Sequence, residues 1–127
     1  MLTAGQTILL PKPGHDTAHL WVVVVSASKI TGEAVIVNLT TQRTHSDPTV
    51  ILQPGDHPFV QHATVAFFAD ARIVDGRLLA KGVEACTFRK HVDCSPALLQ
   101  RIQEGLFSSP HTPNKVKVFA GNQLSQA

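Results

Sequence analysis

Seven of the 127 residues are histidines, and histidine is the side chain that gains and loses protons near neutral pH. His15 and His19 lie four positions apart, but they flank a turn and the start of an expected strand, and neither His-x-His nor His-Glu-x-x-His occurs. Two histidines with this spacing share a face only on a helix, so the pattern disfavours a metal centre. We expect no cofactor. The other histidines are expected to be loop or surface residues that make ordinary hydrogen bonds, namely His45, His57, His62, His91 and His111.

Motifs for nucleophilic or nucleotide chemistry are missing from the sequence. Gly-x-Ser-x-Gly, Gly-x-x-x-x-Gly-Lys and Gly-x-Gly-x-x-Gly do not occur. The two cysteines, Cys86 and Cys94, form no Cys-x-x-Cys pair, which favours two reduced thiols over a disulfide framework or a zinc knuckle. We expect both to be buried as small hydrophobic residues.

The composition is that of a folded domain. The chain is 43% hydrophobic and 16% charged, against a usual charged share of about 25%, which excludes a disordered tail, a coiled coil and a collagen-like repeat. The longest apolar run, Leu20 to Val25, has six residues, where a membrane span needs about 20. The first fifteen residues lack the pattern of a secretory signal, so we expect a cytoplasmic protein without a membrane segment.

Charge is distributed unevenly along the chain. Residues 1–71 hold three Lys/Arg and five Asp/Glu, whereas residues 72–127 hold eight and four. This basic second half permits a partner that carries phosphate without requiring one.

The pattern of short apolar runs predicts one domain over residues 1–127. Strands are expected at Thr7–Leu10, Leu20–Ser26, Ala34–Leu39, Thr49–Leu52, Thr64–Phe68 and Ala71–Val74, with turn formers between them, Asp75-Gly76 included. Strand starts mostly about 8 to 15 residues apart favour an antiparallel meander or small barrel. Its predicted extent is residues 4–92. A helix is expected at 95–107, since Ser95 can cap it and Pro96 suits its first turn, and Lys115–Phe119 alternates like a strand within a C-terminal strand or tail at 110–127.

Five runs between Ala4 and Leu78 carry a family resemblance in their order and spacing. They are AGQTILL (4–10), HLWVVVVS (19–26), AVIVNLTT (34–41), DPTVIL (47–52) and TVAFFADARIVDGRL (64–78). Together they resemble the MazF/PemK family of toxin endoribonucleases, and the likeness extends over about residues 4–107. The last run is the most specific, because Arg72, Asp75, Arg77 and Leu78 all agree with the family pattern.

The resemblance implies a mainly β protein, a small SH3-like antiparallel barrel of the CcdB/MazF type with a C-terminal helix, that forms a two-fold homodimer. It also implies cleavage of single-stranded RNA without a metal: the ribose 2′-OH attacks phosphorus and leaves a 2′,3′-cyclic phosphate and a 5′-OH. An antitoxin tail would occupy the RNA groove. In the family an Arg that precedes the Pro of the second strand and a Thr or Ser that ends the third strand carry the chemistry. Those positions fall on His19, followed by Leu20 instead of Pro, and on Thr40.

His19 in place of the family arginine changes the expected chemistry. An imidazole titrates near a pH of about 6.5, so His19 could act as acid or base, with His15 as the other half of the pair and Lys12 assisting on phosphate. The loss of the arginine also removes a fixed charge and a forked donor that match phosphate. Arg72 and Arg77 are further candidates for RNA contact, or they pair with Asp70 and Asp75 around a turn.

A loop rich in turn formers, residues 53–62, is a second departure from the family pattern. Phe59 could stack a base there and the loop histidines, His57 and His62, could meet phosphate, although a buried Phe59 that anchors the loop is the favoured interpretation. Dimerisation is expected from the family and from the number of large apolar side chains that one small chain would have to bury, namely Trp21, Phe67, Phe68 and Phe107.

Two other functions stay open at this point. The first is the same barrel without catalysis, binding nucleic acid or a protein such as an antitoxin, a gyrase-like partner or a phage factor, because small barrels host many functions. The second is a barrel that uses its histidines to bind a small molecule or a metal.

Overall fold

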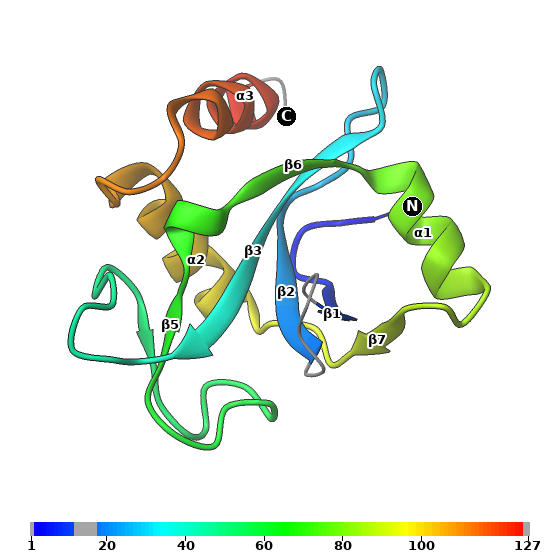
Figure 1. The fold of residues 1–127 in the computed structure, drawn as a ribbon. Helices are drawn as coiled ribbons and strands as arrows, with labels where there is room; N and C mark the ends of the chain where they lie inside the picture. The colour runs from blue at the N-terminus through cyan, green and yellow to red at the C-terminus, as the bar shows by residue number, and fades with distance from the viewer. Residues whose placement is uncertain (1, 12–17, 126–127) are drawn as a thin grey trace.

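A computed structural model describes residues 2–11 and 18–125 as a small mixed α/β protein. Seven strands form one antiparallel sheet in the order β4-β5-β3-β2-β1-β7, with β6 paired to β3 beside this path. Three α-helices and a short 3-10 turn accompany the sheet (Figure 1). The strands are β1 (Thr7–Pro11), β2 (Ala18–Val25), β3 (Glu33–Thr41), β4 (Ile51–Leu52), β5 (Thr64–Ala66), β6 (Arg72–Asp75) and β7 (Arg89–His91). The helices are α1 (Gly76–Glu84), α2 (Pro96–Ser108) and α3 (Asn114–Ser125), and the 3-10 turn spans Phe68–Asp70.

The antiparallel sheet and the C-terminal helix confirm part of the fold prediction, but with three α-helices beside the sheet the protein is mixed α/β and not mainly β. The sheet is not closed in the described chain, so a barrel is not seen. The long strand β3 serves two parts of the sheet: its first half pairs with β6, and its last three residues pair with β5. All six predicted strands, at 7–10, 20–26, 34–39, 49–52, 64–68 and 71–74, match observed strands within two residues at each end.

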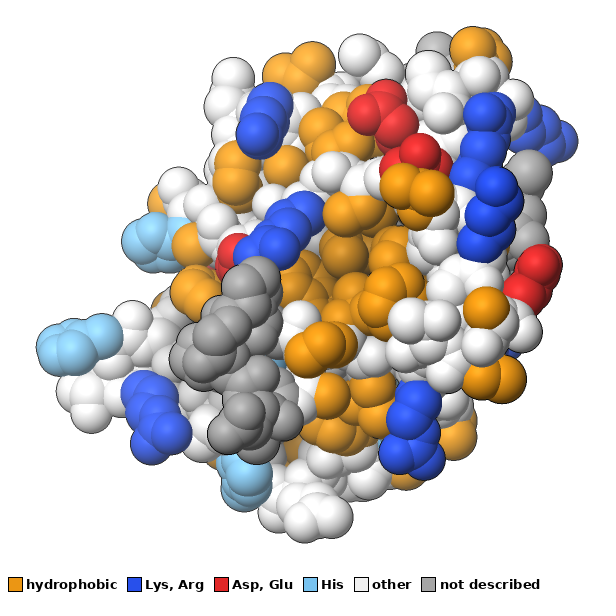
Figure 2. Space-filling view, turned by 45° about the vertical axis from the view of Figure 1, so that its right-hand side comes forward, with side chains coloured by type: hydrophobic (Ala, Val, Ile, Leu, Met, Phe, Trp, Pro, Cys, Tyr) orange, Lys and Arg blue, Asp and Glu red, His pale blue; other side chains and the backbone are white. Residues whose placement is uncertain are grey.

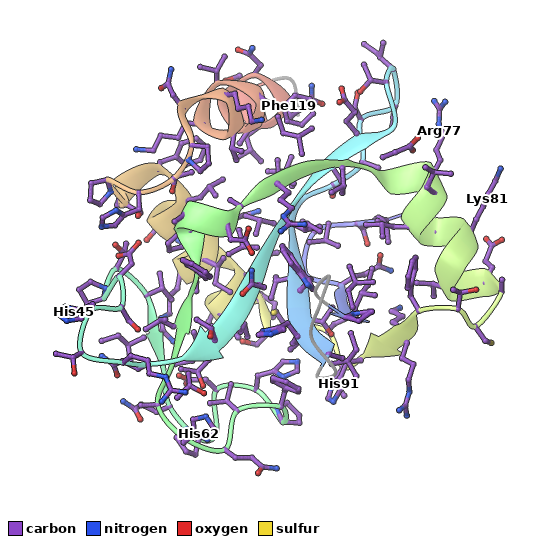
Figure 3. The ribbon with its side chains drawn as sticks, viewed as in Figure 1. His45, His62, Arg77, Lys81, His91 and Phe119 are labelled. Atoms are coloured by element: carbon purple, nitrogen blue, oxygen red, sulfur yellow. The ribbon has the colours of Figure 1, made fainter. Side chains whose placement is uncertain are left out.

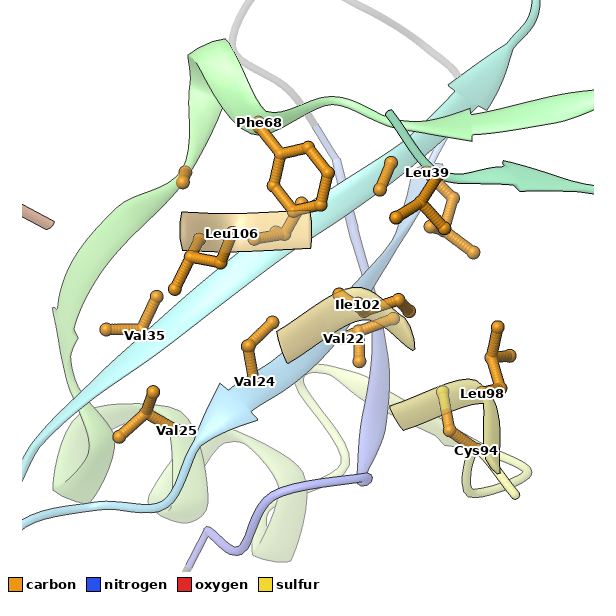
Figure 4. Close-up of a cluster of buried hydrophobic side chains, with 14 of the residues drawn as sticks. Val22, Val24, Val25, Val35, Leu39, Phe68, Cys94, Leu98, Ile102 and Leu106 are labelled. Atoms are coloured by element: carbon orange, nitrogen blue, oxygen red, sulfur yellow. The ribbon is translucent and has the colours of Figure 1, made fainter. Parts of the chain in front are cut away.

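β2 runs through the middle of the sheet and is covered on both faces. Val22 and Val24 pack in a core with α2 and α3, while Trp21 and Val23 belong to a second core beneath α1. Successive strand residues point to opposite faces, so this apolar run needs a cover on each side, as the sequence predicted. Figure 4 shows the first core, in which Ile102 and Leu106 of α2 pack against the sheet.

α2 begins and packs as its sequence predicts. Ser95 caps it, with its hydroxyl oxygen accepting from the Leu98 amide at 3.1 Å, and Pro96 occupies the first turn. The stripe that faces the sheet includes Leu98, Ile102 and Leu106, all buried. A helix with one apolar face gains most of its stability from packing that face against the sheet.

The strand predicted at Lys115–Phe119 is wrong, because this segment lies in α3. The same residues have helical spacing: Val116 and Ala120 are four apart and both are buried. Val118, which an alternating strand would bury with Val116, is 55% exposed. The amides of Val116 and Lys117 donate to the Pro113 carbonyl oxygen and start the helix.

The turn predicted at Asp75-Gly76 is also wrong, because α1 begins there. The Asp75 carboxylate accepts from the amides of Arg77 and Leu78 and caps the helix. Figure 2 shows this side of the molecule, where hydrophobic side chains gather and Lys and Arg surround them.

The two cysteines differ in burial. Cys94 is buried as expected, but Cys86 is exposed after the end of α1, so the prediction for Cys86 is wrong.

Candidate functional site

A cavity of about 500 Å³ opens at one end of the sheet. Its walls come from the start of β2, the end of β3, the 53–62 loop and the end of β7. The polar side chains that line it are His19, Thr40, Thr41, Gln61, His62, Thr64 and His91. Figure 3 shows His62 and His91 at this end of the sheet, whereas Arg77 and Lys81 lie away from it on α1.

His19 and Thr40, the two positions that the sequence assigned to chemistry, line this same cavity. β2 and β3 pair antiparallel with Trp21 opposite Asn38. The residues before Trp21 and after Asn38 therefore run toward one end of the sheet. The strand pairing brings the predicted pair of residues into one site.

The 53–62 loop is held to the body of the protein at two points. Asp56 accepts from the Gln53 amide at 2.8 Å and lies 3.5 Å from Arg101 of α2. Nε2 of His57 lies 2.7 Å from the Val92 carbonyl oxygen, and its Nδ1 accepts from the Phe59 amide at 3.1 Å. One wall of the cavity is thus fixed to α2 and to the end of β7.

His57 is a loop residue that makes ordinary hydrogen bonds, as expected, but it is buried and does not lie at the surface. It is 3% exposed, and both ring nitrogens have partners within the chain. The Nε2–H tautomer satisfies both partners, because a carbonyl only accepts and an amide only donates. Both ring nitrogens are engaged within the chain, so His57 positions the loop in this structure.

Phe59 lies on the cavity wall and is 36% exposed, so the favoured expectation of a buried anchor is wrong. Its ring packs edge-on against His91, with 6.0 Å between the ring centroids. A partly exposed aromatic ring at a cavity is suited to stacking on a base.

His62 and His91 also line the cavity. His62 is one of the loop histidines that were expected to meet phosphate, whereas no functional role was expected for His91. Nε2 of His62 lies 2.9 Å from the Thr41 hydroxyl oxygen. Nδ1 of His91 accepts from the Val92 amide at 2.8 Å. The pairing of Thr41 with Thr64 could have indicated His62, since this residue immediately precedes β5. Nothing in the sequence indicated that β7 pairs with β1 and brings His91 here.

The two candidate arginines lie outside the cavity. Arg72 forms a 3.0 Å ion pair with Asp70, and its guanidinium lies 5.0 Å from the centre of the Trp21 ring. This confirms the predicted pairing with Asp70. Arg77 projects from α1 over Gly32, where an added Cβ would come within 2.7 Å of Arg77 Nε. His15 and Lys12 lie outside the described residues.

The described cavity wall carries neither a lysine or arginine nor a grouped set of metal ligands. None of the described residues that line the cavity is Lys or Arg. Within residues 2–11 and 18–125, no three His, Cys, Asp or Glu side chains are grouped to hold a metal ion. In the same part of the chain no helix is long and apolar enough to cross a membrane.

No protein-family model matches this chain, and no curated protein matches it either. The similarity to the MazF/PemK family therefore stays a hypothesis based on the residues themselves.

Proposed function

We propose that this chain is a divergent endoribonuclease of the MazF/PemK type that cleaves single-stranded RNA, without a metal ion, in the cavity between β2, β3 and the 53–62 loop. One observation carries the proposal: His19 and Thr40, which the family pattern assigns to chemistry, line one cavity although 21 positions separate them. An SH3-like arrangement of the strands, a homodimer and an antitoxin partner belong to the same proposal.

The side chains available suit phosphoryl transfer to the ribose 2′-OH. This reaction needs proton transfer at the attacking and leaving oxygens and hydrogen-bond donors for the charge that develops on phosphate. His19 is suited to proton transfer, and the Thr40 hydroxyl can donate to a phosphate oxygen. Phe59 offers a face for one base. The cavity can therefore hold one phosphate and one adjoining base.

The lack of lysine and arginine on the described cavity wall favours a second candidate function. Affinity for nucleic acid comes largely from Lys and Arg contacts to phosphate, and the described cavity wall has none. The alternative is a domain of the same fold that binds nucleic acid or a protein and does not cleave RNA. The two functions differ in whether the RNA chain is broken.

The test compares variants on a long single-stranded RNA in EDTA. His19→Ala and Thr40→Ala should each lower the cleavage rate by about 100-fold or more, the usual effect of removing an acid–base group or a phosphate donor. His45→Ala is the matched control, because His45 is exposed on another loop. Intact RNA with the wild-type protein would refute cleavage, and equal rates in all variants would refute the site.

A further inference from the structure

Among the described residues, His19 and Thr40 leave two requirements of the reaction unfilled, since His15 and Lys12, the residues expected to meet them, lie outside the described part of the chain. Transfer to the 2′-OH needs a second proton-transfer group, and phosphate needs donors in the absence of lysine and arginine on the described wall. We infer that His62 serves as the general base of the RNA cleavage and that His91 donates a hydrogen bond from its neutral ring to the phosphate. This inference rests on the proposed function and assigns two further residues of the same site.

His91 is held in one tautomer by its own backbone. Nδ1 accepts from the Val92 amide at 2.8 Å, so in the neutral ring the hydrogen is on Nε2. The ring is also packed against Phe59 and against His57, whose ring centroid lies 5.3 Å away. His91 thus offers a fixed N–H donor at the cavity wall, and a donor that is already oriented needs no rearrangement as charge develops on phosphate.

His62 is oriented by the end of β3. Its Nε2 lies 2.9 Å from the Thr41 hydroxyl oxygen. Within the described part of the chain, Nδ1 is therefore the ring nitrogen that can contact a ligand. When Nε2–H donates to Thr41, the Nδ1 lone pair is open and can accept a proton. A base whose ring is held by a third group is the arrangement common to general-base sites.

In the proposed cleavage step two histidines transfer protons and a third donates a hydrogen bond. His62 Nδ1 takes the proton of the ribose 2′-OH while O2′ forms a bond to phosphorus. The P–O5′ bond breaks, and protonated His19 gives its proton to O5′. The products are a 2′,3′-cyclic phosphate and a 5′-OH, with His62 protonated and His19 neutral. His91 stays neutral and donates from Nε2 to a non-bridging phosphate oxygen throughout.

Two substitutions of His91 separate donation from simple packing. His91→Leu removes the donor and should lower kcat by about 100-fold to 1,000-fold. His91→Gln keeps an N–H at the end of the side chain and should restore at least about a tenth of the wild-type rate. Equal loss in both variants, or no loss in either, would overturn the assigned role.

Substitution of His62 should change the pH profile as well as the rate. The other titratable side chains on the described wall are His19 and His91. His62→Ala should lower kcat by about 100-fold or more and remove the rise of the rate with pH on the acidic side, because that rise reports the base. Thr41→Val keeps the strand and removes only the orienting hydroxyl. It should lower kcat about 10-fold with both limbs of the profile retained.

A single experiment distinguishes failure of this inference from failure of the proposed function. Cleavage rates in EDTA are compared on unmodified RNA for four proteins: wild type, His62→Ala, His91→Leu and the control His45→Ala. The affinity of each protein is then measured on 2′-O-methyl RNA of the same sequence, because this RNA cannot be cleaved through its 2′ oxygen. We expect affinity within about 3-fold of wild type for His62→Ala and loss of cleavage. Cleavage by wild type with unchanged rates and pH profiles in both variants would overturn this inference alone, whereas no cleavage by wild type would overturn the proposed function with it.

Discussion

Nε2 of His57 lies 2.7 Å from the carbonyl oxygen of Val92. This bond joins the middle of the 53–62 loop to the residue that follows β7. The same carbonyl oxygen accepts from the buried Thr7 hydroxyl at 2.7 Å, so β1, β7 and the loop meet at one atom. Phe59 and His91, on either side of this junction, both line the cavity. A buried histidine thus sets the distance between two walls of the proposed site.

Replacing His57 should destabilise the protein and loosen the loop. His57→Ala removes a buried ring and leaves the Phe59 amide without its partner. We expect a loss of about 1–3 kcal/mol in the free energy of unfolding, measured by urea denaturation, and faster hydrogen exchange at the Phe59 amide. His45→Ala should change stability by less than about 0.5 kcal/mol, as exposed substitutions do. Equal stability of the two variants would contradict the buried role of His57.

Two helical glycines should respond to alanine in opposite directions. A Cβ on Gly105 of α2 would lie 2.5 Å from Val50 Cγ2 and 2.8 Å from Phe68 Cζ, so Gly105→Ala overpacks the core. We expect a loss of about 1–3 kcal/mol. Gly121 of α3 has its nearest atom at 3.9 Å, and Gly121→Ala should raise stability by up to about 1 kcal/mol through helix propensity. Thermal unfolding of both variants tests this, and a stabilised Gly105→Ala would contradict the packing described for α2.

Asp47 should make the stability of the fold sensitive to acid. Burial alone would raise the pKa of this carboxyl, but hydrogen bonds from Ser109 and Thr49 outweigh it and hold the pKa below its ordinary value. A carboxyl whose pKa is lowered by folding stabilises the folded state at pH values above its ordinary pKa of about 4. This contribution is lost as the pH falls through the pKa of the folded state. Asp47→Asn should therefore be less stable than wild type at pH 7, and the difference should shrink toward pH 3. A constant difference in urea denaturation between these pH values would rule out the linkage.

The two thiols should differ in reactivity. Burial, and secondarily the charge of Asp93, raise the pKa of the Cys94 thiol to about 11, so it is neutral and shielded at pH 8. Cys86 is exposed. Iodoacetamide should label Cys86 alone in the folded protein and both cysteines in urea, as mass spectrometry of the peptides would show. Rapid labelling of Cys94 without denaturant would contradict its burial.

The elements that local patterns specify were predictable from the sequence. β2 contains a run of six apolar residues that only a central strand can bury, and α2 has a cap, a first-turn proline and an apolar stripe. α3 was misjudged because Val116 and Val118 alternate like a strand, and only the buried contacts of Val116 and Ala120 reveal the helical face. α1 was missed because Asp75-Gly76 is compatible with either a turn or a helix cap.

Half of the candidate site was predictable for a similar reason. His19 lies at the start of β2 and Thr40 near the end of β3. Because these neighbouring strands are antiparallel, strand order alone brings the two residues together. His62 and His91 reach the cavity through a long loop and through a three-residue strand, whose partners no local pattern specifies. The dimer argument from large apolar side chains is weaker than the sequence suggested, because Trp21 and Phe68 are buried within the single chain. Phe107 is 40% exposed and Phe67 is partly exposed, so these two remain partly at the surface.

We propose that the cavity lined by His19 and Thr40 cleaves RNA through the ribose 2′-OH. In the decisive experiment the purified protein is incubated in EDTA with a single-stranded RNA and with its 2′-O-methyl counterpart, and the fragment ends are determined by mass spectrometry. We expect fragments with 2′,3′-cyclic phosphate and 5′-OH ends from the unmodified RNA, none from the methylated RNA, and none from unmodified RNA with His19→Ala. Intact RNA, 5′-phosphate ends, or equal cleavage of the methylated strand would contradict this proposal.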